Sequence, residues 1–459
     1  LVLFFSLLIA NIRLIMKFYL FIFKKKRSAL NQFKFAASNQ KLKTSKMQKI
    51  FNINWLLIGF LIIGACGKDS SVIIDENGNN LDVPELSNPN NPYEIVDTDV
   101  VNFYSESNII SKPLEGENFY GQDAHYLRNQ PSYIKNNDGT IIDNVTGLMW
   151  EMDMGEKITF DEAFTKASNS NLGGYNDWRV PTIKELYSLI LFSGSVKGET
   201  AINLFIDTNY FNQPLGNTSI GEREIDAQTW SATEYVGKTM NTDETVFGVN
   251  FIDGRIKGYP KFRLKTNTLN NMYFRMVRGN TDYGKNNFID NGNGTISDLA
   301  SGLMWQKADD GISKNWEESL AYAENLELAN KNDWRLPNAK ELQSIVDYTR
   351  SPQTTNSPAI NPVFDTSEII DPNGNTGHYP FFWTGTTHLD GANPYTGAVY
   401  VAFGEGQGKM NSTLMDVHGA GCQRSDPKSG NRDDFPQYFG PQGDVRYVYN
   451  YVRCVRTID

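Results

Sequence analysis

The stretch Asn332-Asp333-Trp334-Arg335-Leu336-Pro337 decides the fold, because a close copy of it occurs earlier in the chain as Asn176-Asp177-Trp178-Arg179-Val180-Pro181. Each copy runs directly into a predicted helix. Thr182 with Glu185, and Asn338 with Glu341, stand at the cap and third positions of a capping box. A junction that recurs after about 155 residues indicates tandem domains and not a short-period solenoid.

Further blocks recur in the same order around this junction. Together they predict a first domain at residues 118–280 (copy one) and a second at 281–459 (copy two). The matched blocks are Asn137–Ile141 and Asn293–Ile296, Gly147–Trp150 and Gly302–Trp305, Lys184–Leu186 and Lys340–Leu342, Trp230–Thr233 and Trp383–Thr386, and Arg275–Arg278 and Arg453–Arg456.

Each copy combines helix and strand signals. Asn-Gly turns between short apolar runs predict an opening hairpin, and the Gly-Leu-Met-Trp block predicts a buried strand. Two capped helices follow, and the remainder is β-rich up to a terminal strand. This is an α+β arrangement of two helices on a mainly antiparallel sheet. The predicted core faces of the helices are Phe160, Phe164 and Ala167, Ile183, Leu186 and Ile190, Trp316, Leu320 and Ala323, and Ala339, Leu342 and Val346.

The first 117 residues predict export and anchoring. We interpret residues 1–46 as upstream sequence translated by mistake, and residues 47–66 as a lipoprotein signal peptide that ends in the lipobox Ile63-Gly64-Ala65-Cys66. Cys66 would then carry acyl chains that hold the protein at the outer membrane or cell surface. A plain transmembrane anchor is the alternative, but the apolar run is short of the ~20 residues needed to span. Residues 67–117, rich in polar residues, predict a disordered tether.

Charge argues against one class of partner. The chain has a net charge of −10, and residues 1–66 contain no Asp or Glu, so all 53 acidic residues lie beyond them. No basic patch is visible that could release counterions from a phosphate backbone, so we expect no nucleic-acid partner.

Apart from Cys66, the chain has two cysteines, Cys422 and Cys454. An even number of cysteines in an exported protein is typical of a disulfide. We therefore expect these two to be bonded.

In their order, the repeated blocks resemble the Lcl C-terminal domain family, which is found in exported bacterial proteins and named after an adhesin. The resemblance covers nearly all of residues 130–280 and 285–457. It implies a surface protein that binds a glycan or another protein. The Arg-Leu-Pro helix start and the closing Arg-Cys-Val-Arg also look like a C-type-lectin-like domain, so each copy is expected to have that fold by analogy.

The chain departs from the family at its cysteines. Many members carry a first-helix Cys that could pair with the closing Cys, whereas Ala167 and Ala323 stand at that place here, and Met276 replaces the closing Cys in copy one. The resemblance therefore leaves Cys422 as the partner for Cys454.

Several conspicuous residues have a structural explanation. Trp150, Trp178, Trp305 and Trp334 could stack on sugars, but large aromatics in regular elements are mostly buried, and we expect core packing. We expect Asp177 with Arg179, and Asp333 with Arg335, to form ion pairs at the helix entry. Asp290–Thr295 offers hard oxygens to Ca²⁺, but Gly292 breaks the EF-hand spacing, so we predict a tight turn and no cofactor.

An insertion in copy two is the candidate site. Copy two is longer than copy one between the Trp block and the closing Arg block. Functional residues concentrate on such loops. Asp416, His418, Arg424 and Asp426 could line an anion or glycan site or hold a metal, and His378 and His388 could contribute. The alternative is a surface loop with its own turns.

The chain carries no nucleophile elbow, HExxH or CxxC motif. We therefore expect a binding protein and not an enzyme. The two alternatives are an enzyme that uses the insertion, with His418 and Asp416 as the reactive pair, and a structural envelope component.

Overall fold

The computed structural model describes residues 73–74, 80–81, 91–263 and 265–458. The chain forms two units, Leu1–Asn80 and Leu81–Asp459, and the second holds both copies. The short strands β1 (Ile73–Ile74) and β2 (Asn80–Leu81) pair with each other. The predicted segments 1–46 and 47–66, with Cys66, lie outside the described residues. Within the described part, no helix is long and apolar enough to cross a membrane.

Each copy contains an antiparallel four-stranded sheet in which the closing strand pairs with the Gly-Leu-Met-Trp strand. In copy one Trp150 lies between Ile141 and Val277, and copy two repeats the register around Trp305. The two sheets are β5 (Tyr133–Lys135), β6 (Thr140–Asp143), β7 (Leu148–Glu151) and β15 (Val277–Gly279), and β16 (Phe288–Asp290), β17 (Thr295–Asp298), β18 (Leu303–Gln306) and β26 (Val455–Thr457).

All four predicted capping boxes are present, with the cap side chain accepting from the third backbone N–H. They fix the starts of α3 (Phe160–Ser168), α4 (Ile183–Ser188), α5 (Trp316–Glu324) and α6 (Ala339–Ser344). The remaining helical turns are α7 (Pro352–Thr355), η1 (Asp123–His125), η2 (Leu172–Gly174), η3 (Thr218–Ile220) and η4 (Arg432–Asp434).

The aromatic core prediction is confirmed. Trp150, Trp178, Trp305 and Trp334 are all buried, as are the predicted apolar faces of the helices except Phe164. Phe164 is 43% exposed, because it lies at the rim of α3, where its ring contacts the edge of the buried Phe160 ring.

The two copies share one six-stranded sheet, in the order β10-β11-β12-β23-β20-β19. Copy one supplies three strands and copy two the other three, and the halves meet where β12 pairs antiparallel with β23 at Ile256 and Gln423. Since equivalent strands meet at this seam, the copies are related by a pseudo-two-fold axis, as in an isologous dimer. The strands are β10 (Thr229–Glu234), β11 (Thr245–Asn250), β12 (Arg255–Pro260), β19 (Phe381–His388), β20 (Gly397–Ala402) and β23 (Gln423–Pro427).

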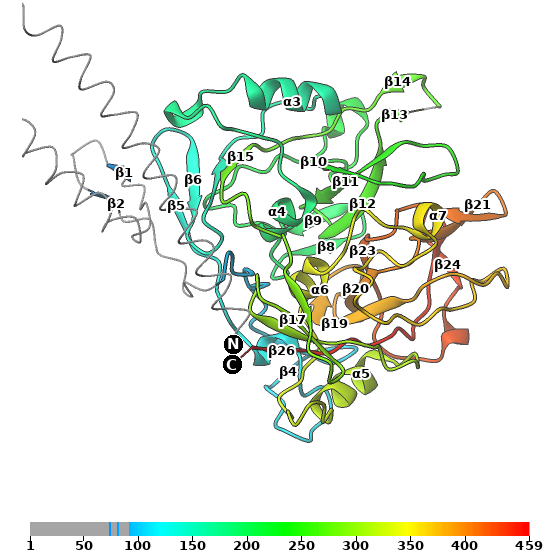
Figure 1. Ribbon diagram of the computed structural model, residues 1–459. Helices are drawn as coiled ribbons and strands as arrows, with labels where there is room; N and C mark the ends of the chain where they lie inside the picture. The colour runs from blue at the N-terminus through cyan, green and yellow to red at the C-terminus, as the bar shows by residue number, and fades with distance from the viewer. Residues whose placement is uncertain (1–72, 75–79, 82–90, 264, 459) are drawn as a thin grey trace, which may run out of the picture. The chain divides into compact units, whose positions relative to one another are not determined.

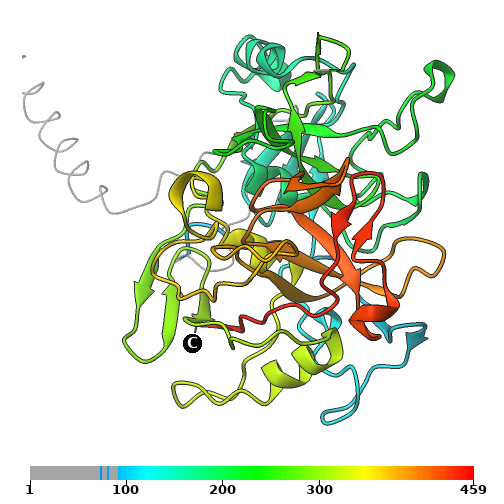
Figure 2. The same cartoon turned by 90° about the vertical axis from the view of Figure 1, so that its right-hand side faces the viewer.

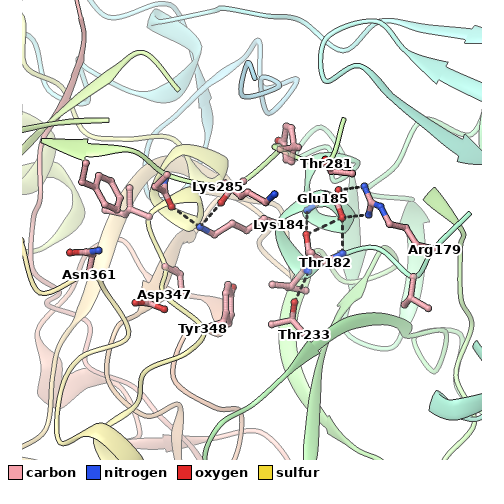
Figure 3. Close-up of a pocket in the computed structure, with 18 residues that line it drawn as sticks. Arg179, Thr182, Lys184, Glu185, Thr233, Thr281, Lys285, Asp347, Tyr348 and Asn361 are labelled. Carbon is pink, nitrogen blue, oxygen red and sulfur yellow. Dashed lines mark hydrogen bonds and ion pairs between the residues drawn. The ribbon is translucent and has the colours of Figure 1, made fainter. Parts of the chain in front are cut away.

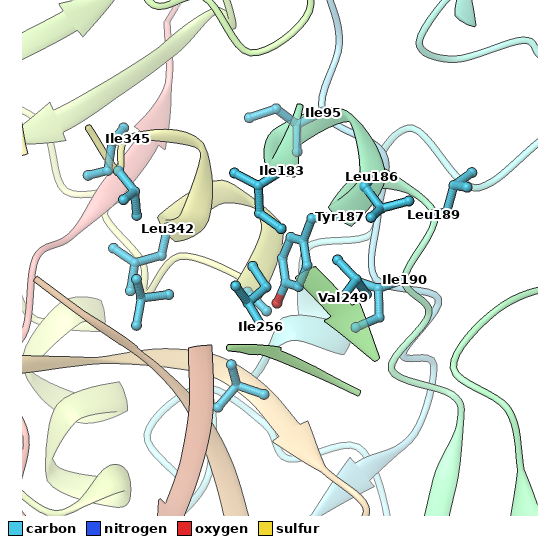
Figure 4. Close-up of a cluster of buried hydrophobic side chains, with 14 of the residues drawn as sticks. Ile95, Ile183, Leu186, Tyr187, Leu189, Ile190, Val249, Ile256, Leu342 and Ile345 are labelled. Atoms are coloured by element: carbon cyan, nitrogen blue, oxygen red, sulfur yellow. The ribbon is translucent and has the colours of Figure 1, made fainter. Parts of the chain in front are cut away.

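The helices α4 and α6 lie side by side at the centre of Figure 1, against this shared sheet. Their side chains and those of the sheet form one apolar core that contains residues of both copies. Figure 4 shows Leu186 and Tyr187 of α4, Leu342 of α6, and Val249 and Ile256 of the sheet within it. The two copies therefore do not fold as separate domains but share one core.

The insertion of copy two forms a small antiparallel sheet, β22-β21-β25-β24. Figure 2 shows this region in orange and red beside the shared sheet. Its strands are β21 (Gln407–Met410), β22 (Thr413–Asp416), β24 (Tyr438–Phe439) and β25 (Asp444–Val445). Three further two-stranded ladders are β3 (Phe103–Tyr104) with β4 (Ile109–Ile110), β8 (Ser195–Lys197) with β9 (Thr200–Asn203), and β13 (Phe262–Arg263) with β14 (Thr268–Leu269).

The tether predicted for residues 67–117 does not extend that far. Tyr93, Val96, Phe103 and Tyr104 are buried, so residues 91–117 belong to the folded unit. Asp and Ser side chains of this segment serve turns and crossing hydrogen bonds: Ser105 accepts from the backbone N–H of Asn108, and Asp97 accepts from that of Arg128.

The predicted disulfide is absent. Cys422 and Cys454 are both buried and both free. Cys422 lies against Gly406 and His418, whereas Cys454 lies near Tyr322 of α5. Both thiols pack in the same apolar cluster of copy two without bonding to each other, which a count of cysteines cannot show.

Candidate functional site

A cavity of about 580 Å³ lies at the junction of the two copies, and we call it the inter-copy cavity. Copy one contributes the segment Arg179–Glu185 and Thr233. The connection from β15 to β16, at the start of copy two, contributes Thr281, Tyr283–Asn286 and Phe288, and the rest of copy two contributes Ile345–Tyr348 and Asn361. Figure 3 shows these side chains around a common space. Its volume lies in the range of small-ligand pockets, about 300–1,000 Å³.

One wall of the inter-copy cavity is a bidentate ion pair. The Arg179 guanidinium donates to both carboxylate oxygens of Glu185 at 2.6 Å, and Glu185 also accepts from the backbone N–H of Thr182 at 2.8 Å. Glu185 is therefore saturated and is not a free base. The Arg179 side chain stays 29% exposed, so part of its guanidinium faces the cavity.

Lys184, a residue of copy one, forms the part of the cavity wall that lies against copy two. Its Nζ donates to the carbonyl oxygens of Gly284 and Ser344 and to Oδ1 of Asn286. Burial lowers its pKa to about 8. The ammonium is held by these acceptors and serves the architecture of the cavity.

The remaining lining offers polar groups of both kinds. The Thr233 hydroxyl accepts from the backbone N–H of Ile183 at 3.0 Å. Asn361 uses its Oδ1 for the backbone N–H of Val363, while Lys285 lies exposed at the rim. The ring of Tyr348 adds an aromatic surface. The cavity can hydrogen-bond a polar ligand and pack against its apolar part.

The predicted insertion site is not brought together as a pocket. Asp416 is buried and accepts from the Tyr235 hydroxyl at 2.7 Å and from the backbone N–H groups of His418 and Gly419. Burial, followed by the nearby Glu405, raises its pKa to about 7. Because Tyr235 belongs to copy one, Asp416 fastens the insertion to the other copy.

His418 and Arg424 meet on a residue that the sequence did not single out, Asp444. His418 Nε2 lies 2.7 Å from Asp444 Oδ1, and Arg424 pairs with Oδ2. Burial and the neighbouring Arg424 lower the pKa of His418 to about 4, so the imidazole is neutral near pH 7. This network joins β23 to β25 and lines no part of the inter-copy cavity.

The other candidates are also structural. Asp426 is buried and accepts from the backbone N–H groups of Tyr447 and Val448 and from Asn450. His388 is buried between Ser425 and the carbonyl oxygen of Asp253. His378 is buried too, and burial lowers the pKa of both histidines to about 4.

The ion pairs predicted at the helix entry have other partners. Arg179 and Arg335 pair with Glu185 and Glu341, whereas Asp177 and Asp333 pair with the closing arginines Arg278 and Arg456. The backbones of Arg179 and Arg335 bridge to Val277 and Val455, so each extended segment runs along the closing strand, and its aspartate meets the closing arginine of its own copy.

Asp290–Thr295 closes the hairpin of β16 and β17 as a tight turn. Asp290 accepts from the backbone N–H of Gly292 and pairs with Lys307, and Asn293 accepts from the Thr295 hydroxyl. Within the described part of the chain, no group of three or more His, Cys, Asp or Glu residues is placed to hold a metal ion.

Sequence reasoning missed the residues that build the cavity. Lys184, Glu185 and Thr233 lie in repeated blocks, but repetition alone signals a shared fold. The usable signal was a lysine repeated within the apolar start of two equivalent helices, because lysine is almost never buried without acceptors.

The fold and the site define a duplicated α+β protein with a ligand-sized cavity between its copies. The model of the Lcl C-terminal domain matches residues 139–278 and 294–419, more than half of the chain, and the chain belongs to this family. The two matched segments correspond to copy one and copy two. No curated protein and no solved structure matches the chain.

Proposed function

We propose that the protein is a lipid-anchored surface protein that binds a glycan or a protein ligand in the inter-copy cavity, each copy being a variant of the C-type-lectin-like arrangement. The observation that carries this proposal is the cavity itself, which both copies and the connection between them build. Its size suits a sugar unit or a short peptide segment.

The chemistry of the lining favours binding over catalysis. The inter-copy cavity is lined by no His, Cys or Ser. Of its two carboxylates, Glu185 is saturated by Arg179 and Thr182, and Asp347 accepts from the hydroxyl and the backbone N–H of Thr349. Lys184 is tied to three acceptors. Nucleophilic catalysis needs a nucleophile next to a base that can take its proton. Fixed donors and acceptors beside an aromatic surface are what a recognition site needs.

A Thr281→Trp variant tests the proposal, because Thr281 lies exposed at the cavity wall and its side chain forms no hydrogen bond with the residues that the structure describes. The purified chain and this variant would be screened against glycan and surface-protein arrays. Thr208→Trp, at an exposed turn away from the cavity, is the matched control. We expect the control to keep binding that Thr281→Trp loses. Ligands bound equally by both variants would contradict the proposal.

Anchoring is tested separately. Labelling of growing cells with radioactive palmitate should mark the wild-type chain and not Cys66→Ala, because the thioether to the diacylglycerol needs that thiol. Label on both forms would contradict the predicted lipidation.

A further inference from the structure

The two copies present the same threonine in the same local frame. The Thr233 hydroxyl accepts from the backbone N–H of Ile183, and the Thr386 hydroxyl accepts from that of Ala339, both at 3.0 Å. Each threonine therefore stands at the start of the second helix of its copy, beside the bidentate arginine–glutamate pair. We call the surroundings of Thr386 the copy-two cleft.

The copy-two cleft is already occupied by the chain's own N-terminal segment. Thr386 donates to Oδ2 of Asp123 at 2.6 Å, and Thr98 donates to the same oxygen at 2.6 Å. Asp123 is buried. Three residues later, Tyr126 lies against Arg335, with the guanidinium carbon 5.3 Å from the ring centroid. A carboxylate from η1 and the aromatic ring of Tyr126, the residue that directly follows η1, fill this cleft.

Copy one has the same arrangement of threonine, helix start and arginine–glutamate pair, but in the described part of the chain no turn like η1 fills it. Among the residues that the structure describes, no acceptor receives the hydroxyl proton of Thr233. The Arg179 side chain is 29% exposed, whereas that of Arg335 is 7% exposed. The reason lies in the connections. A long segment, 91–132, precedes β5, the first strand of the copy-one sheet, but β15 ends at Gly279 and β16, the first strand of the copy-two sheet, begins at Phe288. The connection is too short to supply a second turn like η1.

We propose that the inter-copy cavity receives an acidic turn of a partner protein, with an Asp carboxylate on Thr233 and an aromatic side chain three residues later beside Arg179. This inference rests on the proposed function and names the class of its ligand. A peptide is favoured over an acidic sugar because the built-in occupant supplies both groups from a single polypeptide turn. Lys285 at the rim is exposed and pairs with Asp282 at 3.2 Å, so it adds a cation near the opening that is already partly balanced.

One difference between the copies sharpens the proposal. Gly385 lies against the occupant, and a Cβ on it would stand 3.1 Å from the backbone nitrogen of Asp123. Copy one has Ala232 at the equivalent position. The methyl group therefore holds a bound segment a few tenths of an ångström farther out than Asp123 lies in copy two. Removing it should tighten binding.

The probe is a synthetic peptide with the sequence of residues 121–128, capped at both ends, and its counterpart with Asn in place of the Asp. Binding to the full chain would be followed by fluorescence anisotropy. Two things disfavour a charged Asp123 in copy two, its burial and the nearby Asp97. Copy one has Gly284 where Lys340 meets Asp97, and its cavity is open, so a bound carboxylate stays charged there. We therefore expect the Asp peptide to bind about tenfold more tightly than the Asn peptide near pH 7, since a charge-assisted hydrogen bond is worth at least about 1.4 kcal/mol. Thr233→Val should lose about the same factor, and Ala232→Gly should gain a few-fold. Thr208→Val, an exposed control, should change nothing.

Three results would overturn the proposal. They are equal binding of the two peptides, no binding at millimolar concentration, and binding that Thr281→Trp leaves intact. Thr233→Val also removes the acceptor for the backbone N–H of Ile183 and could fold poorly for that reason. The gain in peptide affinity expected for Ala232→Gly is then an independent check of the proposal. Binding of glucuronate without the peptide would overturn this inference and leave the proposed function standing. The proposed function fails only if Thr281→Trp also leaves every array ligand bound.

Discussion

Lys184 and Lys340 occupy equivalent positions of the two copies, and each crosses to the helix of the other. Lys184 Nζ donates to the carbonyl oxygen of Ser344 at 2.6 Å, and Lys340 Nζ donates to that of Ser188 at 2.8 Å. This reciprocal pair follows the pseudo-two-fold axis that relates the halves of the shared sheet. These two crossing bonds hold α4 against α6 and thereby keep the wall of the inter-copy cavity in place.

Replacing Lys340 should weaken the junction. Lys340 is 3% exposed and also donates to the carbonyl oxygen of Asp97. Lys340→Met keeps the length of the side chain but leaves two buried carbonyls without their donor, so the free energy of unfolding should fall by about 1–3 kcal/mol. Urea denaturation measures it. Lys285→Met, at an exposed site, should stay within about 0.5 kcal/mol. Equal values for the two variants would show that the crossing bonds do not hold the copies together.

The built-in occupant predicts a pH dependence. Burial, and then the nearby Asp97, raises the pKa of Asp123 to about 7. The folded chain therefore binds this proton more tightly than the unfolded chain, and the stability that Asp123 contributes is lost as the pH rises from about 4 to 7. Asp123→Asn cannot ionise and still accepts the bonds from Thr98 and Thr386.

The Asp123→Asn variant should match the wild type below about pH 4 and exceed it by roughly 2–4 kcal/mol at pH 8. Chemical denaturation across this range gives the difference curve. Asp161→Asn, at an exposed position, should show a difference that does not change with pH. A flat curve for Asp123→Asn as well would mean that the carboxylate is not buried in the cleft.

The free thiols can be checked by alkylation. Cys422 and Cys454 are both buried, and burial raises the pKa of each thiol, so neither should react with N-ethylmaleimide in the folded chain. Both should react without a reductant once the chain is unfolded in urea. Peptide mapping by mass spectrometry distinguishes the forms. A cross-linked Cys422–Cys454 peptide would contradict the free thiols and show that the disulfide implied by the family resemblance forms.

Asp444 should matter for the stability of the insertion and not for ligand binding. Although burial opposes ionisation, Arg424 and His418 hold the pKa of Asp444 well below its usual value. Asp444→Asn leaves Arg424 without its counter-charge and should cost about 3 kcal/mol. Asp433→Asn, at an exposed site, serves as the charge control. Unchanged stability, or a loss of binding in the inter-copy cavity, would show that the network has another role.

The residues of the candidate site were only partly predictable. The capping boxes, the tryptophan core and the equivalence of Lys184 with Lys340 follow from patterns within a few residues of one another. The sequence predicted a site at His418 and Arg424 because a polar insertion is usually exposed. The insertion instead packs on copy one, through Asp416 and Tyr235, and its polar groups saturate one another. The cavity lies where the copies meet, which no local pattern encodes.

By itself, the sequence determined that this protein carries one α+β domain twice, where its helices begin, and which aromatics form its core. These features depend on short-range periodicity and on caps three residues from their partners. The tertiary structure alone decided that β12 joins β23, that Asp123 fills one cleft and leaves its counterpart open, and that Cys422 and Cys454 stay apart. Those outcomes depend on the close packing of surfaces brought together from distant parts of the chain, and packing has no signature in the local order of residues.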